Sequence, residues 1–320
     1  GRGAGLHAGA GESIPWTMTG DKLFPIRPRA ILRRVASSGA RRRLARGAVL
    51  LLVLWSLNVL PKRLVVVGPP RTVETLNPKI GVHTRLTDEV EEWKIQRTLQ
   101  MVREMGSRWI VEYFPWGYYE PAKGHYAWGH PDVVVDHALA QGLTIIARID
   151  FVPQRARPEG TTYRYLDREH FADYADFVHA FVRRYRGRIR YVIVWNEPNL
   201  AFEWGYRRPD PEAYAQLLCL TYARAKEADP DVQILAAGLA PTLAPSGSEW
   251  GMDDLAFLER IYAAGGGSCF DGLAIHAYGL TFPPDDPADP QEINFARAEL
   301  FRRVMVEHGS GGKRAYITES

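Results

Sequence analysis

The sequence predicts an α/β protein, a (β/α)8 TIM barrel that is truncated after its seventh strand and follows a basic and hydrophobic N-terminal extension. Apolar strand-like runs alternate with helix-like stretches from about residue 77 onward, and polar residues collect where the runs end. Such strands are buried on both faces, so the alternation indicates a parallel sheet covered by helices. The seven runs are residues 79–86, 108–114, 143–150, 189–197, 232–240, 271–279 and 314–320.

A doubly wound open sheet would show the same alternation of strands and helices. The barrel is favoured because "GVHTRLTDE", after the first run, lacks the glycines of a dinucleotide-binding loop. Functional side chains of a barrel collect at the C-terminal ends of its strands. Here those ends carry a ring of polar, titratable residues: His83, Arg85, Glu112, Tyr113, Arg148, Asp150, Asn196, Glu197, His276, Tyr278 and Glu319.

Two of the helix-like stretches have clear signals. Residues 168–187 carry apolar side chains at the i, i+3, i+4, i+7 spacing of an amphipathic helix, and Gly187 predicts its end. Asp210 and Pro211 predict the N-cap and first turn of the following helix.

The N-terminal part is interpreted as targeting sequence. Arginines crowd the first sixty residues and precede an uncharged apolar run. We expect a disordered basic extension over residues 1–46, a hydrophobic signal or anchor over 47–67, a linker over 68–76 and the incomplete barrel over 77–320. A buried N-terminal helix is the alternative.

An uncleaved anchor would keep the arginines inside and the barrel outside the cytoplasm. The protein is therefore expected to be extracytoplasmic, secreted or tethered to a membrane through residues 48–67. Outside the N-terminal part the charges are mixed, so a nucleic-acid partner is not expected. The oligomeric state is not specified.

Neither cysteines nor histidines form a metal motif. Cys219 and Cys269 are expected to be two buried small hydrophobic residues, with a single disulfide as the alternative. His125, His130 and His137 have no metal-ligand spacing and are expected at the surface. No metal and no organic cofactor is expected.

Three short motifs carry a family resemblance. "WNEPN" after the fourth run, "HAY" after the sixth and "ITES" at the seventh resemble the retaining glycoside hydrolases of clan A, which include cellulases and β-xylosidases. The resemblance covers roughly residues 79–320 and is greatest to family 39, then family 5. It implies a retaining β-glycosidase that acts on β-linked oligo- or polysaccharides through a covalent glycosyl-enzyme intermediate.

The resemblance also implies the roles of individual residues. Glu197 resembles the general acid/base and Glu319 the nucleophile, and retention of configuration requires two such carboxyl groups about 5 to 5.5 Å apart. Asn196 resembles the residue that hydrogen-bonds the sugar 2-hydroxyl. Tyr278 resembles the residue that steadies the nucleophile, and His276 lines the same wall.

Further residues are candidates for substrate binding. Sugar C–H faces pack against aromatic rings, so Trp116 and Trp204 are expected as platforms, although either could instead pack its loop onto the barrel. Arg148 and His83 either bind substrate or are ordinary residues of the barrel mouth. Other aromatic candidates are Tyr118, Tyr119, Trp128 and Trp250.

The chain stops at Ser320, before the eighth strand on which clan members usually place a Trp beneath the sugar. We expect a fragment of a longer reading frame, with an open seam between two strand edges and little or no activity as given. A second function class is a non-catalytic barrel that binds carbohydrate without turnover. The intact carboxylate pair favours the enzyme.

Overall fold

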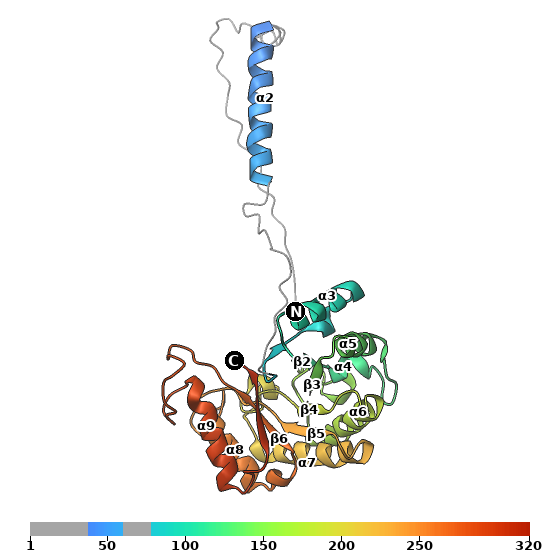
Figure 1. The fold of residues 1–320 in the computed structure, drawn as a ribbon, viewed down its shortest axis with the longest axis vertical. Coiled ribbons are helices and arrows are strands. Elements are labelled where there is room, and N and C mark those ends of the chain that lie inside the picture. Colours follow the sequence, from blue (N-terminus) through green and yellow to red (C-terminus); the bar gives the residue numbers. More distant parts are fainter. Residues whose placement is uncertain (1–37, 60–77) are drawn as a thin grey trace, which may run out of the picture. The chain divides into compact units, whose positions relative to one another are not determined.

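The computed structural model describes residues 38–59 and 78–320. Residues 78–320 contain one parallel sheet whose strands follow chain order, and Figure 1 shows helices on its outer side. Within the described residues β1 and β7 are the two edges of the sheet. The sheet is a nearly closed barrel, because it curves until His83 of β1 lies 3.5 Å from Glu319 of β7. The strands are β1 (Gly81–His83), β2 (Trp109–Tyr113), β3 (Thr144–Ile149), β4 (Tyr191–Val194), β5 (Gln233–Ala236), β6 (Gly272–His276) and β7 (Arg314–Glu319). The predicted truncated (β/α)8 barrel is confirmed.

Strand alternation divides the core into two parts. A small cluster fills the barrel interior, and a larger one lies between the strands and the helices. Successive side chains of a strand point to opposite faces. Tyr113 and Arg148 lie two residues beyond the interior residues Val111 and Ile146, so they share the face that leads to the barrel mouth. The interior cluster is Val111, Ile146, Tyr191, Ile193, Leu235 and Ala274.

The outer layer consists of amphipathic helices. The predicted helix over 168–187 is present as α6, and its apolar stripe is buried. Asp210 caps the next helix as predicted, because its carboxylate accepts a hydrogen bond from the Ala213 amide at 2.8 Å. The helices of the barrel are α3 (Glu92–Glu104), α4 (Trp116–Tyr119), α5 (Gly129–Ala140), α6 (Phe171–Arg184), α7 (Pro211–Ala228), α8 (Asp254–Ala263) and α9 (Ala298–Glu307).

The expectation of two buried free cysteines was wrong. Cys219 on α7 and Cys269, just after a short 3-10 turn, form a disulfide, with their Cα atoms 4.7 Å apart. Each residue is half-buried. The bond closes 50 residues of chain and ties α7 to the connection that precedes β6.

The N-terminal part contains one described helix, α2 (Ser38–Val59). Leu44 and the apolar side chains of residues 49–55 are exposed, and none of the helices in residues 38–59 and 78–320 is long and apolar enough to cross a membrane. Residues 1–37, the linker over 68–76 and the last part of the proposed anchor lie outside the described residues. The anchor and the localisation therefore stay predictions.

Candidate active site

Glu197 lies on a tight turn that follows β4. Trp195 and Glu197 both adopt positive φ angles, 74° and 42°, which non-glycine residues rarely do. Two hydrogen bonds hold the turn: the Glu197 amide donates to the Gly238 carbonyl at 3.0 Å, and the Trp195 indole donates to the Glu203 carbonyl at 2.9 Å. Such strained backbone is typical of functional sites, because the surrounding structure must offset its cost.

Asn199 ties this turn to the segments that follow β5. Its side-chain amide donates to the Ala240 and Met252 carbonyls at 2.8 and 3.1 Å, and its oxygen accepts from the Ala240 amide at 2.9 Å. The residue is fully buried. Asn199, the last residue of the "WNEPN" motif, therefore has a structural role: its hydrogen bonds fix the backbone of the turn that carries Glu197.

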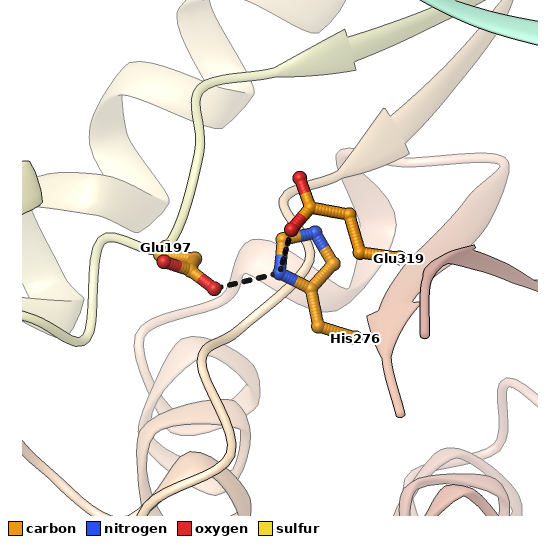
Figure 2. Close-up of side chains that lie close together, drawn as sticks. All are labelled: Glu197, His276 and Glu319. Carbon is orange, nitrogen blue, oxygen red and sulfur yellow. Dashed lines mark hydrogen bonds and ion pairs between the residues drawn. The ribbon is translucent and has the colours of Figure 1, made fainter. Parts of the chain in front are cut away.

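Glu197, His276 and Glu319 converge at the barrel mouth (Figure 2). His276 is buried at the end of β6, and its Nδ1 lies 2.8 Å from Glu197 Oε1 and 3.7 Å from Glu319 Oε2. One oxygen of each glutamate and one imidazole nitrogen all lie within 4.8 Å of one another. Strands β4, β6 and β7 thereby bring together three residues that are far apart in the sequence.

His276 reaches this position because Gly238 has no side chain. A Cβ atom at residue 238 would lie 2.3 Å from both Cδ2 and Nε2 of the imidazole. The space beside β5 is therefore filled by the His276 ring. Sequence inspection did not identify Gly238, since its requirement arises only from the packing of two strands.

Arg148 and Tyr278 hold the carboxylate of Glu319. Arg148 donates to Glu319 Oε1 at 2.7 Å and to Asn196 Oδ1 at 3.0 Å, and the Tyr278 hydroxyl donates to Glu319 Oε2 at 2.9 Å. His83 Nε2 lies 3.5 Å from Glu319 Oε1. All of these residues were identified from the sequence, and they lie together.

These neighbours keep Glu319 ionised. Burial alone would raise the pKa of Glu319, but the charges of His276 and Arg148 and the hydrogen bond from Tyr278 bring this pKa below its ordinary value. Burial and the nearby Arg148 lower the pKa of His83, which favours its neutral form. The site therefore presents an anionic carboxylate beside a second carboxyl group, Glu197.

Two predicted aromatic platforms do not reach the mouth. Trp116 is fully buried against Tyr174 of α6, and its indole donates to Glu120 Oε2 at 2.5 Å. Trp204 is buried against Trp195, with ring centroids 5.7 Å apart. The expectation that these two rings bind sugar was wrong. Both rings are part of the outer core, so the alternative that they pack their loops onto the barrel is the correct one.

Two further members of the predicted polar ring are fully buried, and of these Asp150 lies close to the site, with its carboxylate 3.7 Å from Arg148 Nε. Glu112 points to the outer face of β2 and accepts hydrogen bonds from the Thr84 hydroxyl at 2.6 Å and from the Leu86 amide at 3.0 Å. Asp150 is fully buried and contacts Arg164 at 3.4 Å. Glu112 thus anchors the connection after β1, and Asp150 belongs to a buried ion-pair group.

That ion-pair group also contains Glu203, which the sequence did not reveal. Arg164 pairs with both Asp150 and Glu203. Burial raises the pKa of Glu203 to about 7, although the positive charge of Arg164 opposes the change. A hydrogen bond with Asn196 also lowers the pKa of Glu203. This bond links the ion-pair group to the turn that carries Glu197.

The three converging side chains could also hold a metal ion, since one imidazole nitrogen and two carboxylate oxygens lie within 4.8 Å. Arg148 argues against this use, because its guanidinium lies 2.7 Å from Glu319 and already supplies positive charge there. His130 and His137 bind elsewhere, to the Glu89 carbonyl and the Glu92 carboxylate.

Known proteins resemble this chain in structure, but no match was found by sequence. The sequence matches no family profile and no curated protein. A family 39 glycoside hydrolase from Bacteroides cellulosilyticus WH2 matches with a TM-score of 0.58 and 22% identity, over 75% of this chain and 47% of that one. A GH30 endoxylanase from Clostridium papyrosolvens C71 matches with a TM-score of 0.50 and 15% identity, over 74% and 55%.

A GH5_18 protein from Streptomyces cattleya also matches, with a TM-score of 0.50 and 13% identity, over 64% of this chain and 52% of that one. The chain thus spans about half the length of these solved structures. At such identities the likeness shows the fold, a barrel like those of clan A glycoside hydrolases. A protein of family 39, the family expected from the sequence motifs, is among these structural relatives.

Proposed function

We propose that this chain contains the catalytic residues of a retaining β-glycosidase. The observation that carries the proposal is the separation of the two carboxyl groups: one oxygen of Glu197 and one of Glu319 lie within 4.8 Å of each other. Retaining enzymes place their carboxyl groups about 5 to 5.5 Å apart, whereas inverting enzymes need about 6.5 to 9.5 Å to admit a water molecule.

In the proposed first step, Glu319 attacks the anomeric carbon while Glu197 gives its proton to the leaving oxygen. The C–O bond to the leaving group breaks, and a glycosyl ester forms on Glu319. The lowered pKa of Glu319 suits a nucleophile, because the carboxylate must be ionised to attack. Arg148 and Tyr278 aim it by binding one oxygen each.

In the second step, Glu197 takes a proton from water, and the water oxygen replaces Glu319 at the anomeric carbon. His276 Nδ1, 2.8 Å from Glu197, holds this carboxyl group in position through both steps. Asn196, fixed by Arg148, is proposed to bind the sugar 2-hydroxyl. The steps require no cofactor, and the substrate is a β-linked carbohydrate.

The test is a pair of substitutions assayed with aryl β-glycosides that carry good leaving groups, so that the weak turnover expected from the sequence can be measured. Glu197→Ala should lower kcat by on the order of 10²- to 10⁴-fold, and Glu319→Ala by at least as much. Azide should rescue Glu319→Ala with an α-glycosyl azide product and Glu197→Ala with a β-glycosyl azide. Glu159→Ala, an exposed loop glutamate, is the matched control.

A non-catalytic carbohydrate-binding barrel is the second class, and it predicts sugar binding without any turnover that depends on Glu197 or Glu319. The convergence of Arg148, Tyr278 and His276 on the two carboxyl groups favours the enzyme. Binding alone would not need an ionised carboxylate held this way.

We further propose that the barrel works outside the cytoplasm, secreted or tethered through residues 48–67. The support is the disulfide between Cys219 and Cys269, since such bonds persist in oxidising compartments. Protease protection of the chain in membrane vesicles tests this. A barrel that is digested only after the cytoplasmic side is exposed would contradict it.

A further inference from the structure

A polar cleft lies between the segments that follow β4 and β5, and one of its lining residues, Met252, is hydrogen-bonded to Asn199, two residues from Glu197. It has a volume of about 390 Å³, within the range of roughly 300 to 1,000 Å³ that is common for ligand pockets. Its lining includes Arg208 and Asp210 from one segment, Ser248 and Met252 from the other, and Arg260 of α8.

The cleft wall is joined directly to the turn that holds Glu197. The Met252 amide donates to the Asn199 carbonyl at 2.8 Å, and the Ala201 amide donates to the Trp250 carbonyl at 3.0 Å. Leu200 and Gly251 form an antiparallel bridge between the same segments. The general acid and the cleft therefore belong to one hydrogen-bonded unit.

Aromatic side chains stand exposed on this unit. Trp250 is 77% exposed, and Phe202 and Tyr206, which pack edge to face, are 47% and 61% exposed. Burying a ring of this size is strongly favourable, so several exposed rings on one hydrogen-bonded unit offer a contact surface, which a single exposed indole does not. A flat aromatic face next to polar groups suits a sugar, which presents C–H faces and hydroxyls together.

The charges of the cleft suit a neutral ligand. Arg260 is paired with Glu212 at 2.7 Å, and Asp210 is paired with Arg168 at 3.0 Å. Among the described residues the Arg208 side chain has no hydrogen bond and no ion pair, so its guanidinium is free to donate to hydroxyl oxygens. A polyanion would need a net positive wall, which these pairs do not supply.

We propose that Trp250 and this cleft bind the leaving-group side of a neutral oligosaccharide, so that the preferred leaving group is itself a sugar chain and not a small aglycone. The inference rests on the proposed function, since Glu197 protonates the leaving oxygen. The leaving group must then extend from Glu197, and the segment that carries Glu197 leads to Trp250 and the cleft.

The experiment compares substrates that share a glycone and differ in leaving group. The full chain is assayed with β-xylosyl, β-glucosyl and β-mannosyl fluoride and with the corresponding β-1,4-linked trisaccharides. Trp250→Ala and Arg208→Ala should each lower kcat/KM for the accepted trisaccharide, Trp250→Ala by roughly ten-fold, and leave the fluoride unchanged. Trp93→Ala, which removes an indole that is 62% exposed on α3, should change neither.

A binding measurement separates failure of this inference from failure of the proposed function. The Glu319→Gln variant, with and without Trp250→Ala, is titrated with the same trisaccharides in a calorimeter. Weaker binding in the Trp250→Ala variant supports the inference even if no fluoride is hydrolysed. Equal effects on fluoride and trisaccharide, or unchanged trisaccharide turnover and binding, would overturn it.

Discussion

Single side chains set the ionisation of the proposed nucleophile. Arg148 binds one oxygen of Glu319 and Tyr278 the other, so both lower the pKa of this carboxyl group against the effect of burial. The sequence motifs identified Tyr278 and Glu319, and the end of the third apolar run identified Arg148. Their mutual contacts follow from strand alternation, which puts Arg148 on the inner face of β3.

Removing one of these contacts should move the pH profile of the enzyme. The acidic limb of kcat/KM reports ionisation of Glu319 and is expected below the ordinary glutamate range. Tyr278→Phe deletes one hydrogen bond to the carboxylate, so the pKa rises and the limb shifts upward by roughly one pH unit. A limb that stays in place or moves down would contradict this, and Tyr222→Phe, which deletes a hydroxyl bond to Asp271 outside the proposed site, is the control.

The buried Glu203 should make stability depend on pH. Its pKa of about 7 exceeds the ordinary value of 4.5, so the folded chain binds its proton more tightly than the unfolded chain does. This contribution is present below pH 4.5 and is lost as the pH rises to about 7, at most about 3 kcal/mol.

Glu203→Gln should remove that dependence, since an amide does not titrate. Urea unfolding at pH 4.5 and pH 7.5 measures it: the fall in the free energy of unfolding should be smaller in the variant than in the parent chain. Glu159→Gln, at an exposed position, should behave like the parent. An equal fall in Glu203→Gln would refute the assignment.

At the scale of elements, Gly238 decides where the His276 ring of β6 can lie. A Cβ at this position would overlap the imidazole at 2.3 Å. Gly238→Ala should therefore displace His276 from Glu197 and lower kcat/KM by roughly ten-fold or more, because misplaced groups catalyse poorly. Circular dichroism should show that the fold is kept. Gly129→Ala, where a Cβ meets nothing within 4 Å, is the control, and activity equal to the control would count against the assignment.

The disulfide between Cys219 and Cys269 also connects two elements, because it links α7 to the segment before β6. Its loss should lower the free energy of unfolding by about 2 to 4 kcal/mol, since the unfolded chain gains freedom. Denaturant unfolding of a Cys219→Ser, Cys269→Ser double variant measures the change, and a reductant should affect the parent only. A stable variant with no change would show that the bond is not structural.

Elements with local signals were predictable, and those that depend on distant partners were not. Helix α6 followed from its apolar spacing and the cap of α7 from Asp210, because both signals lie within a few residues. The pairing of Cys219 with Cys269 depends on how α7 packs, so the sequence left it open. Trp116 and Trp204 look like loop aromatics in sequence, yet the outer core buries them.

At the scale of the whole molecule, the parallel barrel explains why residues from β3, β4, β6 and β7 meet. All strands run in one direction, so their C-terminal ends share one rim. The sequence predicted this convergence from the order of runs and the polar residues at their ends. The sequence predicted too many residues at this rim. Glu112 points to the outer face of β2, and Asp150 is buried in an ion pair with Arg164.

The central claim is that Glu319 forms a covalent bond to the sugar while Glu197 handles the proton. The most direct measurement is mass spectrometry of peptides after incubation with 2-deoxy-2-fluoro-β-glycosides of xylose, glucose and mannose, which accumulate the intermediate. The account predicts a single glycosyl adduct on the peptide that contains Glu319, absent in Glu319→Gln. An adduct on another residue, or turnover with inverted product and no adduct, would contradict it.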